Sequence, residues 1–163
     1  MKTAIIYMSK HGTTEKIAEI IKSKLEDQEV HIFNLKKTKP VDLNDFDTII
    51  IGGSVYVGAV QKKLRKYVAD NLSILLLKKI ALFLVCMDKT EKRKEFFANA
   101  FTAELRDRSI ADGFPGGEFN FGRMNFLERA IIRKITGKSS DISEIDYQAI
   151  DEFTGKVNTL RKD

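Results

Sequence analysis

Three hydroxyl side chains cluster around one glycine near the start of the chain. Ser9, Thr13 and Thr14 flank Gly12 in the segment 9–14, between an apolar β-branched run and the first helical pattern. Hydroxyl groups donate to phosphate oxygens, and a glycine lets the backbone approach a ligand closely. The start of a helix adds free backbone N–H groups and the positive end of a dipole. The spacing therefore predicts a phosphate-binding loop.

Helix capping is the simpler explanation for part of this pattern. Thr13 alone would be interpreted as an N-cap, because Ser and Thr cap helices frequently. Three hydroxyl groups with a glycine favour phosphate, and the segment matches neither the nucleoside-triphosphate loop nor the three-glycine dinucleotide loop. We interpret Lys10 as an aid to phosphate binding and His11 as a loop residue with a backbone contact.

The elements that must position this loop alternate along the chain. Strands are predicted at 2–7, 30–35, 46–53, 80–86 and 111–121, of which 30–35 has an alternating pattern and 111–121 is broken by glycines; helices are predicted at about 13–26, 64–72, 91–105 and 143–160. Continuous apolar strands are typical of a parallel sheet covered on both faces. Right-handed crossovers favour a doubly wound α/β fold with the strand order 2-1-3-4-5. We expect one domain over residues 1–163, with a helical insert at about 121–140 after the fifth strand.

In such a sheet the ligand lies beyond the carboxyl ends of the strands, at the switch point between strands one and three. The loops that meet there are 9–14, 54–60 and 87–90. Topology therefore places the predicted phosphate loop where a ligand is expected.

Composition narrows the class of protein. Hydrophobic residues make up 43% and charged residues 31%, as in soluble globular proteins, and nothing reaches the ~18 apolar residues of a membrane span. Met1 runs directly into the first strand, so we expect no signal peptide. The single Cys86 lies in an apolar run, which predicts inert core packing in a reducing cytoplasm. His11 and His31 lie far apart without neighbouring cysteines, so no metal site is expected.

The net charge of +5 is concentrated in one segment. Residues 123–138 hold five basic side chains and one acidic side chain, a net charge of +4 that leaves +1 for the rest of the chain. Such a local excess of positive charge indicates that this segment contacts an anionic partner.

The same segment predicts an amphipathic helix with a second apolar face. We expect one stripe to pack on the domain, formed by Met124, Leu127, Ile131 and Ile135. Phe126 and Ile132 are predicted to point away from the domain, beside Arg129 and Arg133. Such a helix suits an anionic membrane surface or a partner protein. A solvated helix without any partner is the alternative.

The segment 9–14 resembles the phosphate signature of the flavodoxin family, [ST]-x-T-G-x-T. Ser9, Gly12 and Thr14 match it, and His11 stands where the family usually has a hydroxyl residue. The resemblance implies FMN as the cofactor. The residues implied to bind it in this loop are Ser9, Lys10, His11, Gly12, Thr13 and Thr14.

The other two loops resemble the segments that surround the flavin ring in this family. In the segment 53–58, Tyr56 is the stacking candidate, with an exposed loop tyrosine as the alternative, and Gly58 would let the backbone rearrange on flavin reduction. The segment 87–90 lacks a second aromatic residue, which leaves one ring face open or covered by something else. The implied ring contacts are Ser54, Val55, Tyr56, Val57, Gly58, Met87, Asp88 and Lys89.

Within this superfamily, the whole length is similar to the menaquinone-dependent protoporphyrinogen dehydrogenases, which carry an extra segment after the fifth strand. The similar pieces are the opening loop and residues 51–58, 91–94 and 123–138. The resemblance implies an enzyme that passes electrons from a porphyrinogen-like substrate to a quinone, with the flavin carrying the chemistry. The implied substrate or membrane contacts are Phe126, Arg129, Ile132, Arg133 and Lys134.

Two functions therefore stay open. One is this FMN-dependent oxidoreductase, and the alternative is an electron-transfer flavodoxin that docks on redox partner proteins by charge, without a small substrate. Neither involves nucleic acid. We expect a cytoplasmic protein, which the 123–138 helix would bring to the inner face of the membrane in the enzyme hypothesis.

Overall fold

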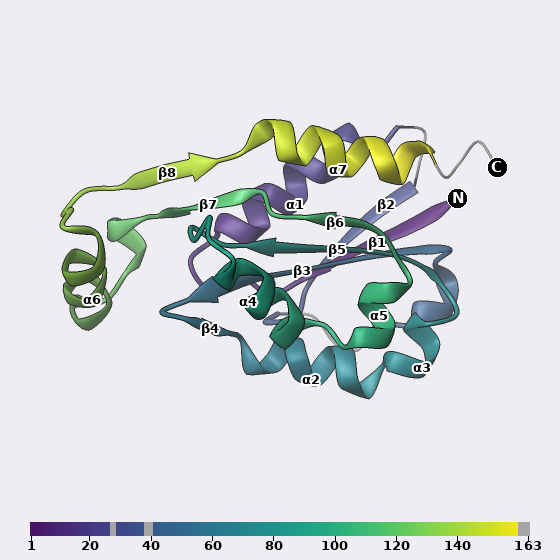
Figure 1. The fold of residues 1–163 in the computed structure, drawn as a ribbon. Helices are drawn as coiled ribbons and strands as arrows, with labels where there is room; N and C mark the ends of the chain where they lie inside the picture. Colours follow the sequence, from purple (N-terminus) through teal and green to yellow (C-terminus); the bar gives the residue numbers. More distant parts are fainter. Residues whose placement is uncertain (27–28, 38–40, 160–163) are drawn as a thin grey trace.

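A twisted parallel sheet forms the centre of the computed structural model, which describes residues 1–26, 29–37 and 41–159. The strand order is β2-β1-β3-β5-β6, and the short β4 forms a hairpin with β3 (Figure 1). With β4 set aside, this is the predicted order 2-1-3-4-5, and the α/β fold class is confirmed. The strands are β1 (Lys2–Tyr7), β2 (Glu29–Asn34), β3 (Thr48–Tyr56), β4 (Ala59–Val60), β5 (Lys79–Val85) and β6 (Ser109–Gly113).

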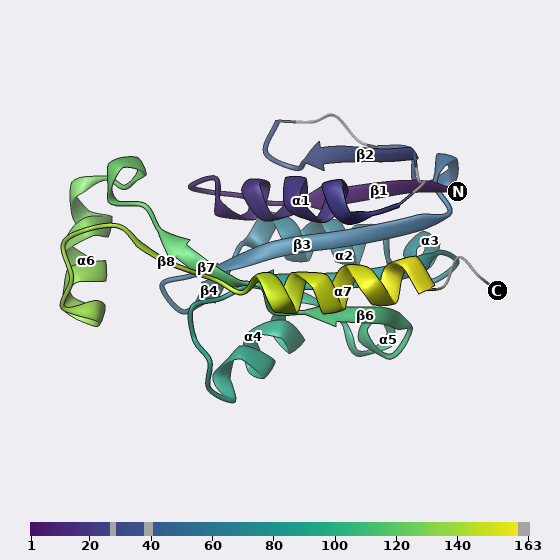
Figure 2. The same cartoon turned by 90° about the horizontal axis from the view of Figure 1, so that it is seen from above.

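Helices cover both faces of the sheet, which explains why its central strands β1, β3 and β5 are largely apolar and buried. On one face lie α1 (Thr13–Lys24) and α7 (Tyr147–Thr159) (Figures 1 and 2). The other face is covered by α2 (Lys62–Asp70), α3 (Leu72–Leu75), α4 (Lys92–Ala100) and α5 (Ala103–Asp107), with a 3-10 turn η1 (Leu43–Asp45). In β1, Ala4 and Ile6 belong to one apolar cluster, and Ile5 and Tyr7 belong to the other. Successive side chains of a strand point to opposite faces, so each face needs its own apolar layer.

An arm extends from the sheet at the end where the parallel strands finish (Figures 1 and 2). It consists of residues 116–145, in which β7 (Gly116–Phe119) pairs antiparallel with β8 (Ile142–Ile145). Between these strands lie the turn η2 (Phe121–Arg123) and the helix α6 (Phe126–Thr136). The predicted helical insert is therefore present, mounted on a two-stranded ribbon.

The ribbon overturns two predicted elements. The strand predicted at 111–121 is divided between β6 and β7, since Phe114 and Pro115 separate them and Gly116, the first residue of β7, has φ 69°. The helix predicted at 143–160 begins at Tyr147 because residues 142–145 pair with β7; residue 160 lies outside the described residues.

The helix predicted at 91–105 is also divided. α4 ends at Ala100, and a new helix, α5, begins after Thr102, whose side chain accepts a hydrogen bond from the Leu105 N–H at 3.4 Å. A local N-cap thus restarts the helix within an otherwise helical pattern.

α6 presents a different face to the domain from the one predicted. Ile132 is 1% exposed and packs with Phe121 and Met124, whereas Leu127 and Ile135 are 67% and 65% exposed. The prediction that Leu127 and Ile135 pack on the domain and that Ile132 points away from it was therefore wrong. The cause is a polar contact. The carboxylate of Glu128, one turn before Ile132, faces Lys10 in the segment 9–14, and the pattern of hydrophobic residues in the helix does not predict such an ion pair. Within the described part of the chain, no helix is long and apolar enough to cross a membrane.

Candidate functional site

The segment 9–14, here called the phosphate loop, forms a tight turn between β1 and α1. Gly12 is the N-cap of α1 with φ 95°, and no side chain caps the helix. Thr13 is therefore not the cap, so the simpler explanation of its hydroxyl fails. Ser9, Thr13 and Thr14 are buried, and Ser9 Oγ accepts a hydrogen bond from the Gly12 N–H at 3.0 Å. Sheltered hydroxyl groups beside an uncapped helix start are a suitable environment for an anion.

The three predicted loops meet around one small cavity of about 40 Å³. Its walls come from the phosphate loop, from residues 54–56, from Met87 and from the arm residues Glu118, Phe119 and Met124. The arm residues were not predicted to line this site, because no local sequence pattern places β7 against the phosphate loop. About 10–15 Å³ of such space holds one water, so the cavity takes only a small group, and a larger one must extend into the space beside it.

That neighbouring space is a groove of about 540 Å³, here called the α6 groove. Val55, Met87 and Phe119 line both the cavity and the groove, so the two spaces are adjacent. Further lining comes from Val57, Gly58, Asp88, Lys92, Phe96, Ile132, Ile135, Thr136, Lys138, Ile142 and Glu144. Of the predicted ring contacts, Lys89 lines neither space, because its ammonium group pairs with Glu144 at 2.9 Å.

The hairpin that borders the groove is strained. Val57 and Gly58 form the turn between β3 and β4, with φ values of 49° and 72°. Glycine adopts such values readily, but a β-branched residue rarely does, and this strain is typical of ligand sites. Below the turn, Gln61 holds Ser54 through both its side-chain amide groups: Oε1 accepts from the Ser54 N–H at 3.1 Å, and Nε2 donates to Ser54 Oγ.

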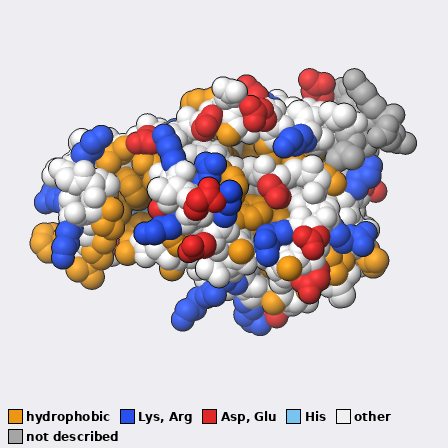
Figure 3. Space-filling view, in the orientation of Figure 1, with side chains coloured by type: hydrophobic (Ala, Val, Ile, Leu, Met, Phe, Trp, Pro, Cys, Tyr) orange, Lys and Arg blue, Asp and Glu red, His pale blue; other side chains and the backbone are white. Residues whose placement is uncertain are grey.

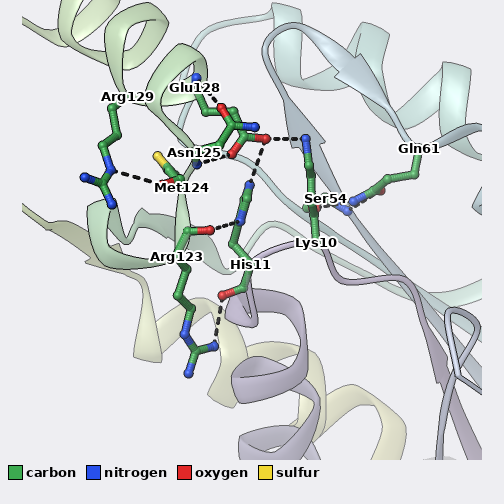
Figure 4. A network of polar contacts seen from close by, with 9 residues as sticks. All are labelled: Lys10, His11, Ser54, Gln61, Arg123, Met124, Asn125, Glu128 and Arg129. Atoms are coloured by element: carbon green, nitrogen blue, oxygen red, sulfur yellow. Dashed lines mark hydrogen bonds and ion pairs between the residues drawn. The ribbon is translucent and has the colours of Figure 1, made fainter.

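The arm contacts the phosphate loop through two reciprocal hydrogen bonds (Figure 4). Arg123 Nη1 donates to the His11 carbonyl at 3.0 Å, and His11 Nδ1 donates to the Arg123 carbonyl at 3.0 Å. His11 thus makes the backbone contact predicted for it. A Cβ at residue 12 would collide with Arg123 Nη1, so the close approach of the arm is a second reason for Gly12.

Thr13 Oγ1 donates to the carbonyl of the arm residue Glu118 at 3.5 Å, and Glu128 supplies a further contact between the arm and the loop. Glu128 Oε1 lies 2.5 Å from Lys10 Nζ and 3.6 Å from His11 Nε2, while its Oε2 accepts from the Asn125 N–H at 3.0 Å (Figure 4). Asn125 Oδ1 accepts from the Glu128 N–H at 2.9 Å, which completes a capping box at the start of α6. The Glu128 carboxylate therefore both caps the start of α6 and holds this helix against the phosphate loop. Lys10 still lines the cavity, so its role toward phosphate stays a prediction.

Burial and charge shift the pKa values of this cluster. Burial lowers the pKa of His11, against the opposing effect of Glu128. Desolvation raises the pKa of Glu128, but the hydrogen bonds from Lys10 and the Asn125 backbone outweigh it and leave this pKa below its ordinary value. Burial, with the nearby Glu128 carboxylate, raises the pKa of Tyr56 to about 12.

The ring of Tyr56 lies next to the ion pair between Lys10 and Glu128. Lys10 Nζ sits 4.3 Å from the centroid of its ring, and the His11 ring lies 5.1 Å away, tilted by 54°. Its buried hydroxyl makes no hydrogen bond among the residues that the structure describes. Lys10 thereby bridges Glu128 and an aromatic face, and the predicted stacking role of Tyr56 stays a prediction.

The predicted contacts on α6 fall into three environments. Phe126 is 85% exposed, and Arg133 and Lys134 are also exposed. Arg129 is half-buried, and its Nε donates to the Met124 carbonyl at 3.0 Å. Ile132 is buried, so the prediction that it points away from the domain was wrong. Among the described residues, no group of three His, Cys, Asp or Glu side chains is placed to hold a metal ion.

Comparison with known proteins identifies the family of this chain. The flavodoxin domain model matches residues 4–146, and an uncharacterized protein of Methanocaldococcus jannaschii is 32% identical over 73% of both chains. Flavodoxin 2 of Bacillus cereus has a similar fold at 21% identity, with full coverage of both chains and a TM-score of 0.61. A flavodoxin from the domain Archaea, at 15% identity and again full coverage, has a TM-score of 0.59. The solved structures show the fold, and the family model shows that this chain belongs to the flavodoxin domain family.

Proposed function

We propose that the protein is an FMN-dependent oxidoreductase that exchanges electrons with a small organic molecule. The observation that carries the proposal is the meeting of the three loops at a cavity adjacent to the α6 groove. The groove volume of about 540 Å³ falls within the ~300–1,000 Å³ of small-molecule sites. The arm residues Phe119, Ile132 and Ile135 wall that groove beside the predicted ring contacts, which gives a small molecule a bounded place to approach the flavin.

The residues of the phosphate loop fit the phosphate of FMN. Ser9, Thr13 and Thr14 bring buried hydroxyl groups, and the uncapped start of α1 brings N–H groups and the positive end of a dipole. Gly12 lets the backbone approach closely. FMN is also the cofactor implied by the flavodoxin resemblance, so the loop chemistry and the family support the same group.

When bound, the flavin supplies the redox chemistry, and the chain supplies binding, orientation and electrostatics. Val55 and Met87 provide half-buried apolar walls between the phosphate cavity and the groove, which exclude water. Tyr56 offers an aromatic face there, and the pairing of Lys10 with Glu128 keeps the local net charge near zero.

The specific form of this proposal is a porphyrinogen-like donor with a quinone as acceptor. It rests on the similarity to the menaquinone-dependent protoporphyrinogen dehydrogenases, including the insert after the last sheet strand. On α6 the exposed Phe126 stands with the exposed Arg133 and Lys134. An apolar side chain among basic ones suits an anionic membrane, so we place the protein in the cytoplasm at the inner face of the membrane, where a quinone is reached.

A second candidate is an electron carrier for an acidic redox partner protein. The observation that favours it is the basic outer surface of α6: its one acidic residue, Glu128, is already paired with Lys10, which leaves Arg133 and Lys134 as exposed cations. Electrostatic docking of this kind weakens as salt rises.

One experiment separates these functions. The full chain is reconstituted with FMN, and porphyrin fluorescence is followed anaerobically from protoporphyrinogen with and without a menaquinone analogue. Quinone-dependent oxidation supports the enzyme, whereas tight FMN binding with no oxidation supports the carrier. A protein that stays colourless contradicts both.

A matched pair of variants tests the membrane part of the proposal. Reversing both charges at Arg133 and Lys134 to Glu should reduce binding to anionic liposomes, and reversing Lys63, an exposed lysine of α2, should not. Equal binding by all three proteins would contradict a membrane role for α6.

A further inference from the structure

A second pocket borders the phosphate loop on the side of β2. It has a volume of about 170 Å³ and is here called the β2 pocket. Residues 9–12 of the loop form one wall, Asn34, Lys36 and Lys37 at the end of β2 form another, and Arg123 of the arm reaches in from outside. The pocket shares residues 9–11 with the cavity of the three loops, but no predicted ring contact from the segments 54–58 and 87–89 lines it. It is therefore distinct from the predicted site of the flavin.

The lining of the β2 pocket is polar. Among the described residues that form it, none is aliphatic, and the imidazole of His11 is the one ring. A flat or apolar molecule would have little surface to pack against. The volume also lies below the ~300 Å³ at which sites for drug-sized molecules begin. The pocket therefore suits a small polar ion.

Positive charge prevails in this pocket. Lys36, Lys37 and Arg123 are exposed, and none of them pairs with a carboxylate in the part of the chain that the structure describes. Lys10 also lines the pocket, but Glu128 balances its charge. Three cations are thus available to a ligand.

The described lining contains one carboxylate, that of Glu15. Burial and a hydrogen bond to Glu15 raise the pKa of the Tyr7 hydroxyl, so this carboxylate already has a donor. Three cations against one carboxylate leave a net charge of +2 in the pocket. On the face of the molecule drawn in Figure 3, by contrast, acidic and basic side chains are interspersed over the body. The excess of positive charge is therefore local.

Hydrogen bonds hold the cations around the pocket. The buried Asn34 accepts from the Lys36 N–H through Oδ1 and from the Lys37 N–H through its carbonyl, both at 2.9 Å. This turn fixes the two lysines beside the loop. Arg123 Nη1 donates to the His11 carbonyl at 3.0 Å, and Arg123 makes no other side-chain hydrogen bond among the described residues. Since a guanidinium group has five N–H donors, most of them remain for an oxyanion.

We propose that the β2 pocket binds a small, multiply charged oxyanion of the phosphate class between Lys36 and Lys37 of the body and Arg123 of the arm. Ammonium and guanidinium groups form short, charge-assisted hydrogen bonds with phosphate oxygens. Because these cations belong to both the body and the arm, the bound ion joins the two and stabilises the docked arm. The inference goes beyond the proposed function, since the site needs no flavin.

The test is calorimetric titration of the full chain, loaded with FMN, with inorganic phosphate at an ionic strength held constant with sodium chloride. We expect one saturable site. Lys36→Gln and Lys37→Gln should each weaken binding about two- to fivefold, as for exposed ion pairs. Glu15→Gln should strengthen binding by a similar factor, because it removes a like charge and keeps an acceptor for the Tyr7 hydroxyl. Affinity that is unchanged in all three variants would overturn the proposal.

The neighbouring lysines of α2 provide matched controls. Lys62 and Lys63 are exposed like Lys36 and Lys37, and they too lack a carboxylate partner within the described residues. Lys62→Gln and Lys63→Gln should leave the phosphate affinity unchanged, and circular dichroism confirms that each variant is folded. Equal weakening by both pairs of variants, or no saturable binding at constant ionic strength, would overturn the proposal.

Hydrogen exchange in the arm, residues 116–145, tests whether the ion joins arm and body. At a phosphate concentration of about ten times Kd, exchange that requires undocking of the arm should slow roughly tenfold, and exchange in α2 should not change. Phosphate that binds without protecting the arm would overturn the bridging role.

The protein without FMN separates this proposal from the proposed function. There we expect a further phosphate site, weakened by Thr14→Ala, beside the one weakened by Lys36→Gln. Loss of the lysine-dependent site when FMN binds would overturn the proposal, since phosphate would then occupy the flavin's own site. If FMN does not bind while the lysine-dependent site persists, the β2 pocket is supported and the proposed function is wrong.

Discussion

Replacing Glu128 by glutamine removes one negative charge from the contact between the arm and the phosphate loop. Glutamine keeps the size of the side chain and serves equally well in a capping box, so the start of α6 is preserved. What is lost is the charge pairing with Lys10, whose Nζ lies 2.5 Å from Glu128 Oε1. The substitution therefore isolates the electrostatic part of arm docking.

The magnitude follows from the exposure of the two partners. A hydrogen bond to a charged group contributes ~1.5–3 kcal/mol, and an exposed ion pair contributes ~0–1 kcal/mol. The Glu128 side chain is 11% exposed, but that of Lys10 is 46% exposed, so water screens one end of the pair. We expect a coupling free energy of about 1 kcal/mol, between these two ranges.

The assay is a double-mutant cycle on the free energy of unfolding in urea, with Glu128→Gln, Lys10→Met and the double variant. The exposed pair Lys66–Asp70 within α2, at 2.8 Å, serves as the control. Its cycle should give ~0.3–0.5 kcal/mol, as for other helical pairs. A coupling at Lys10–Glu128 no larger than this control would refute the reasoning that burial of Glu128 strengthens the contact.

The same cycle has a defined pH dependence. The folded-state pKa of Glu128 is lowered, so its stabilisation is present above the ordinary carboxyl value of 4.5 and is lost as the pH falls through the folded value. The coupling should therefore persist at pH 7 and diminish below pH 4.5. A coupling that grew on acidification would contradict the sign of this shift.

Three further predictions concern the loops of the site. Thr14→Ala should weaken FMN binding roughly 10- to 100-fold, measured by quenching of flavin fluorescence, because a buried hydrogen bond to phosphate is worth ~1.5–3 kcal/mol; unchanged affinity would mean that the phosphate lies elsewhere. Tyr56 has a folded pKa raised from 10.0 to about 12, so its stabilising effect is present below pH 10 and lost as the pH rises toward 12. Tyr56→Phe should reduce the alkaline loss of stability in urea unfolding without removing it, because burial also raises the pKa of Tyr67 to about 12; an identical pH profile would argue against the buried phenol. Val57→Asn should raise the free energy of unfolding by roughly 1 kcal/mol, because asparagine tolerates positive φ better than a β-branched residue; a loss of stability would show that the turn is not strained.

The fold could be predicted where each element carries its own pattern. The apolar runs of β1, β3 and β5 predict buried parallel strands, because a strand covered on both faces of its sheet is apolar on both sides. The phosphate loop could be predicted as well, because its hydroxyl groups and glycine are neighbours in sequence. The ribbon of β7 and β8 could not, because its strands lie on either side of α6 and neither carries a strong pattern alone.

What the sequence by itself determined is thus the α/β sheet, the phosphate loop at its switch point and a basic helical insert after the last sheet strand. Only the tertiary structure decided which face of α6 meets the domain. A hydrophobic stripe predicts the apolar face, but here the Glu128 carboxylate meets Lys10 and His11 from a distant part of the chain and sets the rotation of the helix. That rotation buries Ile132, leaves Ile135 beside Phe96 and creates the α6 groove. The geometry of such a site depends on contacts between segments more than a hundred residues apart, and a local sequence pattern cannot predict those contacts.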